Sequence, residues 1–133
     1  MKNKFLFVLT FFSVVFFASC VQKTASDEVS VSLSSNPTTG SSWTVEIEDE
    51  KVAVLQKDEY KADKASSNLL GSGGNQILTF KLLKPGETKI TLTYGQNWSG
   101  GGIWEKRYGI LKAEKDSKGK LFASFEILKT ETF

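Results

Sequence analysis

The residue types that carry most enzyme chemistry are scarce in this sequence of 133 residues. It has no histidine, which excludes Ser-His-Asp triads, Cys-His pairs and histidine-ligated metal sites. Carboxylate, lysine and hydroxyl chemistry remain, but no pair of acids flanks a recognisable cleft. The single cysteine, Cys20, ends an apolar run near the start of the chain. We therefore expect a protein that is not an enzyme and that needs no cofactor or metal.

The segment Asn36-Pro37-Thr38-Thr39-Gly40 is suited to presenting side chains to a binding partner. Proline presets one backbone angle and glycine permits a positive φ, so the two threonines would be held on a stiff tip. An ordinary turn needs the proline and the glycine, but it gives no reason for two β-branched residues at its apex. We interpret this segment as a binding loop.

A second candidate segment is Gly71-Ser72-Gly73-Gly74. Its glycines leave the backbone bare, so another chain could approach closely enough to form hydrogen bonds with it. It lacks the Lys-Ser/Thr pair of a P-loop and the GxGxxG spacing, which excludes a phosphate cradle. Flexibility alone explains the composition equally well.

The third candidate is Gln96-Asn97-Trp98, which glycines follow. A large aromatic residue in such a polar turn has little core to bury against, which makes Trp98 a candidate contact residue. Trp43 and Trp104 each stand early in an expected strand. We assign Trp43 to the core, and core packing is one explanation for Trp104 as well.

Strands must position these loops, because apolar residues recur with a period of two along most of the chain. Turn signals such as Lys84-Pro85-Gly86-Glu87 and Asp116-Ser117-Lys118-Gly119 separate the runs. With no convincing amphipathic helix, the pattern predicts an all-β sandwich of about seven to eight strands, with a small barrel as the second choice. The runs are 29–33, 43–47, 77–82, 90–94, 108–111 and 121–128.

Two details of these strands need stating. In the run 77–82, the pattern places Ile77, Leu82 and either Thr79 or Phe80 on the core side. Residues 52–55 fit either a short strand or a helical turn, and the mixed-charge stretch 57–67 fits a solvated connection.

The first twenty residues have the layout of a secretory signal peptide, with two early lysines and an apolar stretch from Phe5 to Phe17. That stretch is about 13 residues long, whereas a membrane-spanning helix needs about 20. Its Ala18-Ser19-Cys20 ending resembles the lipobox of bacterial lipoproteins, although Phe17 stands where leucine is usual. The resemblance implies acylation of Cys20; an ordinary signal peptide with a free thiol is the alternative.

These features predict a signal peptide over 1–19, a polar tether over 20–28 and one domain over 29–133. The protein would be anchored by lipid in the bacterial cell envelope, either on the outer membrane facing the periplasm or at the cell surface. Beyond residue 19, 15 of the 17 basic residues remain against 15 acidic ones, without a basic block. This balance excludes a nucleic-acid partner.

The three loops, in this order, resemble those of the chagasin family of inhibitors of papain-like cysteine proteases. That family presents an NPTTG-x-x-W loop, an LLG-x-GG loop and an LTY-x-RPW loop. The matching segments here are 36–43, 69–74 and 92–98, and the resemblance spans about residues 29–114. It implies an immunoglobulin-like β-sandwich.

The resemblance also implies the function: reversible inhibition of a papain-like protease, with the threonine loop at the catalytic centre. The glycine loop would pair by its backbone with the cleft wall, and Trp98 would pack on the other side. We expect a monomer that needs no cofactor. The implied protease-binding residues are Asn36, Pro37, Thr38, Thr39, Gly40, Gly71, Ser72, Gly73, Gly74, Gln96, Asn97 and Trp98.

The sequence departs from the family in two places. Gln96-Asn97 stands where Arg-Pro is common, so we expect a less firmly placed Trp98 and some cost in affinity or a shifted target range. Only the run 29–33 precedes the first loop, where family members have two strands, while residues 115–133 extend past the usual end. We expect the run 121–128 to replace the missing strand and to cover an open sheet edge.

An alternative from another class is a non-inhibitory sandwich lipoprotein that binds glycan or protein through Trp98 and Trp104. Exposed tryptophans would stack on sugars equally well. Such a module has no need for the threonine tip or the bare glycine backbone, which favours the inhibitor.

Overall fold

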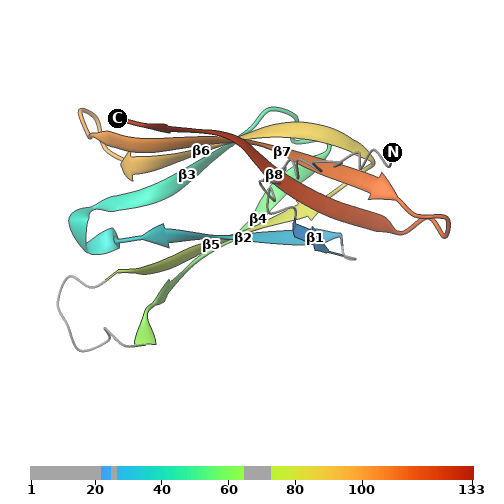
Figure 1. Cartoon of the computed structure of the whole chain (residues 1–133), viewed down its shortest axis with the longest axis horizontal. Coiled ribbons are helices and arrows are strands. Elements are labelled where there is room, and N and C mark those ends of the chain that lie inside the picture. Colours follow the sequence, from blue (N-terminus) through green and yellow to red (C-terminus); the bar gives the residue numbers. More distant parts are fainter. Residues whose placement is uncertain (1–21, 25–26, 65–72) are drawn as a thin grey trace, which may run out of the picture.

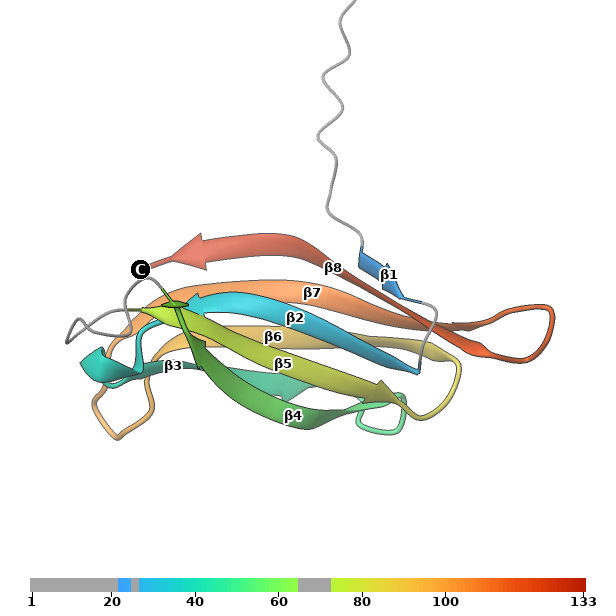
Figure 2. The same ribbon diagram turned by 90° about the horizontal axis from the view of Figure 1, so that it is seen from below.

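The computed structural model describes residues 22–24, 27–64 and 73–133, and these form two antiparallel sheets (Figure 1; Figure 2). One sheet has the strand order β1-β8-β7-β6-β3 and the other β2-β5-β4. The two layers confirm the predicted sandwich over the small barrel. The strands are β1 (Gln22–Thr24), β2 (Glu28–Ser35), β3 (Ser41–Ile47), β4 (Ala53–Ala62), β5 (Gly74–Leu82), β6 (Gly86–Gln96), β7 (Ile103–Lys115) and β8 (Leu121–Thr132).

The core lies between the sheets, and the alternating pattern builds it as predicted. On β2, Val29, Val31 and Leu33 are buried while the serines between them face solvent. Trp43 of β3 is buried in the same cluster, which confirms its assignment. The rings of Phe80 and Phe125 stack with centroids 6.2 Å apart, and this contact joins β5 of one sheet to β8 of the other.

The predicted inward face of β5 is partly wrong. Phe80 and Leu82 are buried as expected, but the positions that alternate with them are Leu78 and Gln76 rather than Ile77. Thr79 on the opposite face is also buried, and its hydroxyl lies 2.8 Å from that of Ser30 on β2. Thr79 lies between Ser30 of β2 and Lys57 of β4, so cross-strand neighbours cover it on the outer face and interrupt the alternation there.

Strand β4 is longer than the sequence indicates. It begins at Ala53, which decides between the strand and the helical turn, and it continues to Ala62 through residues expected to form a connection. From Leu55 onward its residues are exposed, and its pairing with β5 shifts register between Leu55 and Lys57. Backbone pairing holds this part of the strand, so no apolar alternation marks it.

The final hairpin forms as predicted. The Asp116 N–H donates to the carbonyl of Lys120 at 2.9 Å, and this bond closes the turn. Strand β8 then pairs with β7 from the Leu121–Lys115 pair to the Thr132–Glu105 pair. The edge of β7 is covered, as expected for the extension beyond residue 114.

The prediction of a single strand ahead of the first loop is wrong. Residues 22–24, which fall in the segment expected to be a tether, form β1 and pair with β8 through Gln22–Phe125 and Thr24–Ala123. The three residues Gln22, Lys23 and Thr24 are all polar in type, so no hydrophobic pattern in the sequence reveals this strand.

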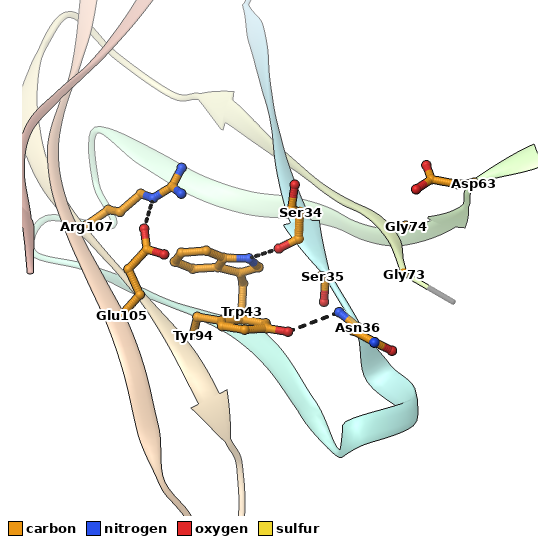
Figure 3. A pocket seen from close by; sticks show the side chains of 10 residues that line it. All are labelled: Ser34, Ser35, Asn36, Trp43, Asp63, Gly73, Gly74, Tyr94, Glu105 and Arg107. Atoms are coloured by element: carbon orange, nitrogen blue, oxygen red, sulfur yellow. Dashed lines mark hydrogen bonds and ion pairs between the residues drawn. The ribbon is translucent and has the colours of Figure 1, made fainter. Parts of the chain in front are cut away.

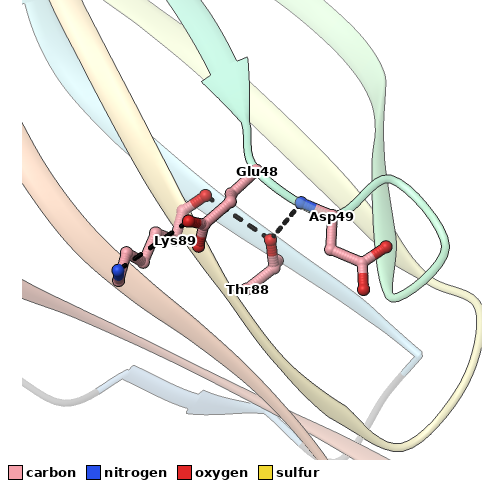
Figure 4. A network of polar contacts seen from close by, with 4 residues as sticks. All are labelled: Glu48, Asp49, Thr88 and Lys89. Atoms are coloured by element: carbon pink, nitrogen blue, oxygen red, sulfur yellow. Dashed lines mark hydrogen bonds and ion pairs between the residues drawn. The ribbon is translucent and has the colours of Figure 1, made fainter.

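The turn between β3 and β4, at the end opposite the candidate loops, rests on a polar network (Figure 4). The buried Thr88 hydroxyl accepts a hydrogen bond of 2.8 Å from the Asp49 N–H, and the Glu48 N–H donates to the Lys89 carbonyl at 3.0 Å. The exposed Lys89–Glu48 ion pair, 3.8 Å apart, contributes little by comparison.

Several predictions concern residues outside those described: the signal peptide over 1–19, Cys20, and Gly71 with Ser72 in the second loop. Within the described ranges, no helix is long and apolar enough to cross a membrane.

Candidate functional site

The described parts of the three candidate segments lie at one end of the sandwich. The β2–β3 and β6–β7 connections lie on the left in both views, together with the end of β4 and the start of β5 (Figure 1; Figure 2). The sheets therefore bring together residues from three separate stretches of the sequence, as predicted.

The first loop forms a short 3₁₀ helix, η1 (Pro37–Thr39), that projects from this end. The Thr39 N–H and its hydroxyl both donate to the Asn36 carbonyl, at 3.2 and 2.7 Å, and the Thr38 hydroxyl donates to the Asn36 side chain. The Gly40 N–H closes the turn on the Pro37 carbonyl at 2.9 Å. Residues 37–40 are exposed, so the threonines stand on a hydrogen-bonded tip as the sequence predicts.

Gly40 is required at the end of this tip for two reasons. Its φ of 76° lies in the left-handed region, which other residues adopt only with strain. In addition, a Cβ placed on it would lie 2.5 Å from Cη2 of Trp98. The Trp98 ring thus rests against the backbone of the first loop while 55% of the residue remains exposed.

The third loop is held by the two residues that depart from the family pattern. The Gln96 side-chain oxygen accepts from the Gly102 N–H at 3.1 Å, and the Asn97 amide donates to the Ser42 hydroxyl at 2.7 Å. The second bond links the third loop to the strand that leaves the first. The expectation of a less firmly placed Trp98 rests on the loss of Arg and Pro alone and leaves out these two hydrogen bonds. The expected effect on affinity stays a prediction.

Only part of the second loop is described. Gly74 is buried in β5, and a Cβ on it would lie 2.3 Å from the Lys61 carbonyl oxygen, so this glycine permits close pairing with β4. Gly73 is partly exposed, and its carbonyl accepts from the Asp63 N–H at 3.3 Å. Of the two glycines of this loop that the structure describes, Gly73 rather than Gly74 therefore offers backbone near the surface.

Beneath the tip, a pocket of about 380 Å³ opens between the two sheets (Figure 3). Trp43 and Tyr94 lie against each other in it, with ring centroids 5.1 Å apart. The Tyr94 hydroxyl accepts from the Asn36 N–H at 3.1 Å, and the Trp43 indole N–H donates to the Ser34 carbonyl at 2.8 Å. Both aromatic residues therefore support the base of the threonine tip.

Charged residues extend this support on one side. The Arg107 guanidinium lies over the Trp43 ring, 5.0 Å from its centroid, and it is paired with Glu105. Stacking on an indole while paired with a carboxylate fixes the orientation of the guanidinium. Neither Arg107 nor Glu105 is among the site residues predicted from the sequence, because both lie on β7 and outside the three loops.

Gln76 is a further supporting residue that the sequence analysis misses. Its side-chain oxygen accepts from the Trp43 N–H at 2.8 Å, and its amide nitrogen donates to the Trp43 carbonyl at 3.0 Å and to Asp58 at 2.8 Å. Strand β3 lies at the edge of its sheet, so this buried amide takes the place of a neighbouring strand. The only sequence signal would have been a polar residue at an inward position.

The whole end of the sandwich is suited to inserting into a concave partner. Its convex tip is tied to its own backbone, to Tyr94 below and to Trp98 beside it, so docking would cost little conformational entropy. The polar groups of the pocket serve mainly to hold the tip.

Comparison with known proteins identifies the family. The model of the family "Chagasin family peptidase inhibitor I42" matches residues 23–110, which is more than half of the chain and includes all three loops. The chain belongs to the chagasin family. The sequence-based identification is thereby confirmed.

Curated relatives of this chagasin-family chain come from two protozoa. Chagasin of Trypanosoma cruzi is 32% identical over 91 residues, which cover 64% of this chain and 80% of chagasin. Amoebiasin-2 of Entamoeba histolytica is 32% identical over 75 residues, covering 56% and 60%, and amoebiasin-1 is 36% identical over 67 residues, covering 50% and 63%. The match thus spans somewhat less than two thirds of either amoebiasin.

A solved structure shares the fold. The crystal structure of the cysteine protease inhibitor EhICP2 from Entamoeba histolytica matches with a TM-score of 0.51 and 30% identity. The match covers 59% of this chain and 70% of the solved one. This likeness supports a chagasin fold, with two antiparallel sheets, for the present chain.

Proposed function

We propose that this chain is a reversible inhibitor of papain-like cysteine proteases, and not itself an enzyme. The observation that carries the proposal is the exposed, hydrogen-bonded tip Pro37–Thr39, which lies beside Trp98 of the third loop in a chain of the chagasin family. The relative whose structure is solved is described as a cysteine protease inhibitor.

In this mechanism the threonine tip enters the active-site cleft and blocks access to the catalytic cysteine. The segment Pro37–Thr39 is a helical turn, so its peptide bonds are not presented in the extended form that aligns a scissile bond. Gly73 would lie against one wall of the cleft and Trp98 against the other. Three such loops could bury about 1,600 Å² in total, the size of a stable interface.

We further propose that lipid on Cys20 anchors the protein in the cell envelope, as the lipobox-like sequence indicates. Strand β1 begins two residues after this cysteine and pairs with the part of β8 nearer the turn, away from the loops. An anchor there would leave the loops free to meet a protease. Metabolic labelling with a radioactive fatty acid tests this: label in the wild type but not in Cys20→Ser is expected, and no label would contradict it.

The double variant Thr38→Ala, Thr39→Ala tests the inhibitory function. We expect it to raise the inhibition constant for papain about tenfold or more, because both side chains lie at the proposed contact. Thr44→Ala, an exposed threonine within β3, is the matched control and should inhibit like wild type. Equal inhibition by all three proteins would contradict the assigned role of the tip.

A further inference from the structure

Strand β8 lies outside the region that the family match covers, yet it returns the chain to the end that carries the loops. The match ends at residue 110, whereas β8 runs from Leu121 to Thr132 and finishes opposite Glu105. Figure 1 and Figure 2 both show the end of the chain on the same side as the first and third loops. The strand thus adds residues to this end that the family motifs do not include.

Three apolar residues, Ile103, Trp104 and Phe133, adjoin where β8 meets the start of β7; we call them the apolar rim. The Phe133 N–H donates to the Trp104 carbonyl at 2.9 Å, which fixes the end of the chain beside the third loop. Their exposed fractions are 43%, 45% and 68%. Single exposed apolar side chains are common; these three differ in that their backbones adjoin at the end of the sandwich that carries the loops.

Trp104 is held in place rather than mobile. Its indole N–H donates to the Ser41 hydroxyl at 3.1 Å, and its ring rests on Gly102, where a Cβ would lie 2.7 Å from Cη2. It is also the extra residue of a bulge, because Tyr94 pairs with Glu105 while Gly95 pairs with Ile103. A tryptophan fixed in this way and still half-exposed loses little entropy on binding.

We propose that the apolar rim is a fourth contact element, which binds an apolar surface of the target protease beside the cleft that receives the loops. This inference rests on the proposed inhibitory function. The rim is continuous with the third loop through residues 99–102, so a protease bound by Trp98 would also reach the rim. The rim would add affinity and select among proteases by the apolar character of that surface.

The contact that fixes Phe133 in the fold does not depend on its side chain. Phe133 follows the last residue of β8, and its fixed contact is made by its backbone, which an alanine keeps. Leu83 offers a matched control, because it is 50% exposed but lies in the β5–β6 connection at the opposite end of the sandwich.

The test compares full-length wild type, Ile103→Ser with Phe133→Ala, and Leu83→Ala against papain and several related proteases. The rim variant should raise the inhibition constant about tenfold for the protease that wild type inhibits best, mainly through faster dissociation, with an unchanged unfolding midpoint. Leu83→Ala should match wild type.

Two results would overturn the inference, and they can be told apart. If wild type inhibits but the rim variant stays within about twofold of it for every protease, the rim is not a contact and the proposed function stands. If folded wild type inhibits none of the proteases, the proposed function fails and the rim proposal fails with it.

Discussion

Gly40 is the point where the first loop contacts the third, because its lack of a side chain leaves room for the Trp98 ring. Its positive φ ends the 3₁₀ turn, and the space where a Cβ would stand is filled by the Trp98 ring. The family motif includes this glycine, but the motif alone gives no sign of the contact with Trp98. The residue therefore sets both the shape of the tip and the position of a candidate contact.

Substituting Gly40→Ala should weaken both the fold and the inhibition. The left-handed φ should cost about 1–2 kcal/mol of unfolding free energy, and displacement of Trp98 should raise the inhibition constant about tenfold. Gly119→Ala is the matched control, because its φ is 79° and nothing lies within 4 Å of a Cβ placed there. Denaturant unfolding and inhibition kinetics would show the contrast; equal inhibition by both variants would refute it.

Strand β3 reaches the threonine tip as an edge strand, and Gln76 supplies the pairing that its outer edge lacks. The side-chain amide binds both the N–H and the carbonyl of Trp43, three residues after Gly40. The contact also joins the two sheets directly beneath the loop. It explains why a polar residue occupies an inward position of β5.

Gln76→Leu should leave two buried groups of Trp43 without partners, at a cost of about 1–3 kcal/mol in unfolding free energy. Inhibition, measured where the variant is folded, should also weaken as the base of the tip loosens. Asp58→Asn keeps an acceptor oxygen for the Gln76 amide and serves as the control. Wild-type stability of Gln76→Leu in chemical denaturation would show that the amide is dispensable.

The hairpin of β7 and β8 carries a polar cluster on its surface. Glu131 of β8 accepts hydrogen bonds from Lys129 and from the Tyr108 hydroxyl of β7. These bonds, with Lys129 contributing most, lower the pKa of Glu131, and the nearby Lys106 adds to the effect. The same carboxylate raises the pKa of both Lys129 and Tyr108.

This cluster predicts the pH dependence of β8. A carboxylate whose pKa is lowered by folding stabilises the fold above its unfolded-state pKa and loses that effect as the pH falls through the folded-state value. The difference in melting temperature between wild type and Glu131→Gln should therefore be largest near neutral pH, begin to shrink near the unfolded-state pKa of about 4.3, and vanish only below the folded-state pKa of Glu131. Thermal melts across this range would check it, and a constant difference would contradict it.

Across the molecule, the sequence predicts best where side chains alternate. The buried valines and leucine of β2, Trp43 of β3 and the final hairpin follow from that pattern and from turn residues. Strand β1 escapes it because its three residues are polar, and the outer half of β4 escapes it because its exposed residues are held by backbone pairing with β5. The three loops were identified by composition and spacing.

Tertiary support of the site is the part that the sequence alone could not predict. Tyr94, Arg107 and Gln76 act from three different strands, and the partners Asn36, Trp43 and Asp58 lie 18 to 64 residues away from them in the chain. The roles of Gln96 and Asn97 likewise depend on Gly102 and Ser42, which only folding brings near. The spacing of the motif residues along the sequence gives no information about these contacts.

Titration of active papain with the folded full-length chain, following hydrolysis of a peptide substrate, would decide whether the chain is an inhibitor. We predict reversible inhibition that is competitive with substrate and leaves the inhibitor uncleaved after prolonged incubation. No inhibition of papain or of several related proteases by folded protein would contradict it, and would favour the alternative of a non-inhibitory binding module.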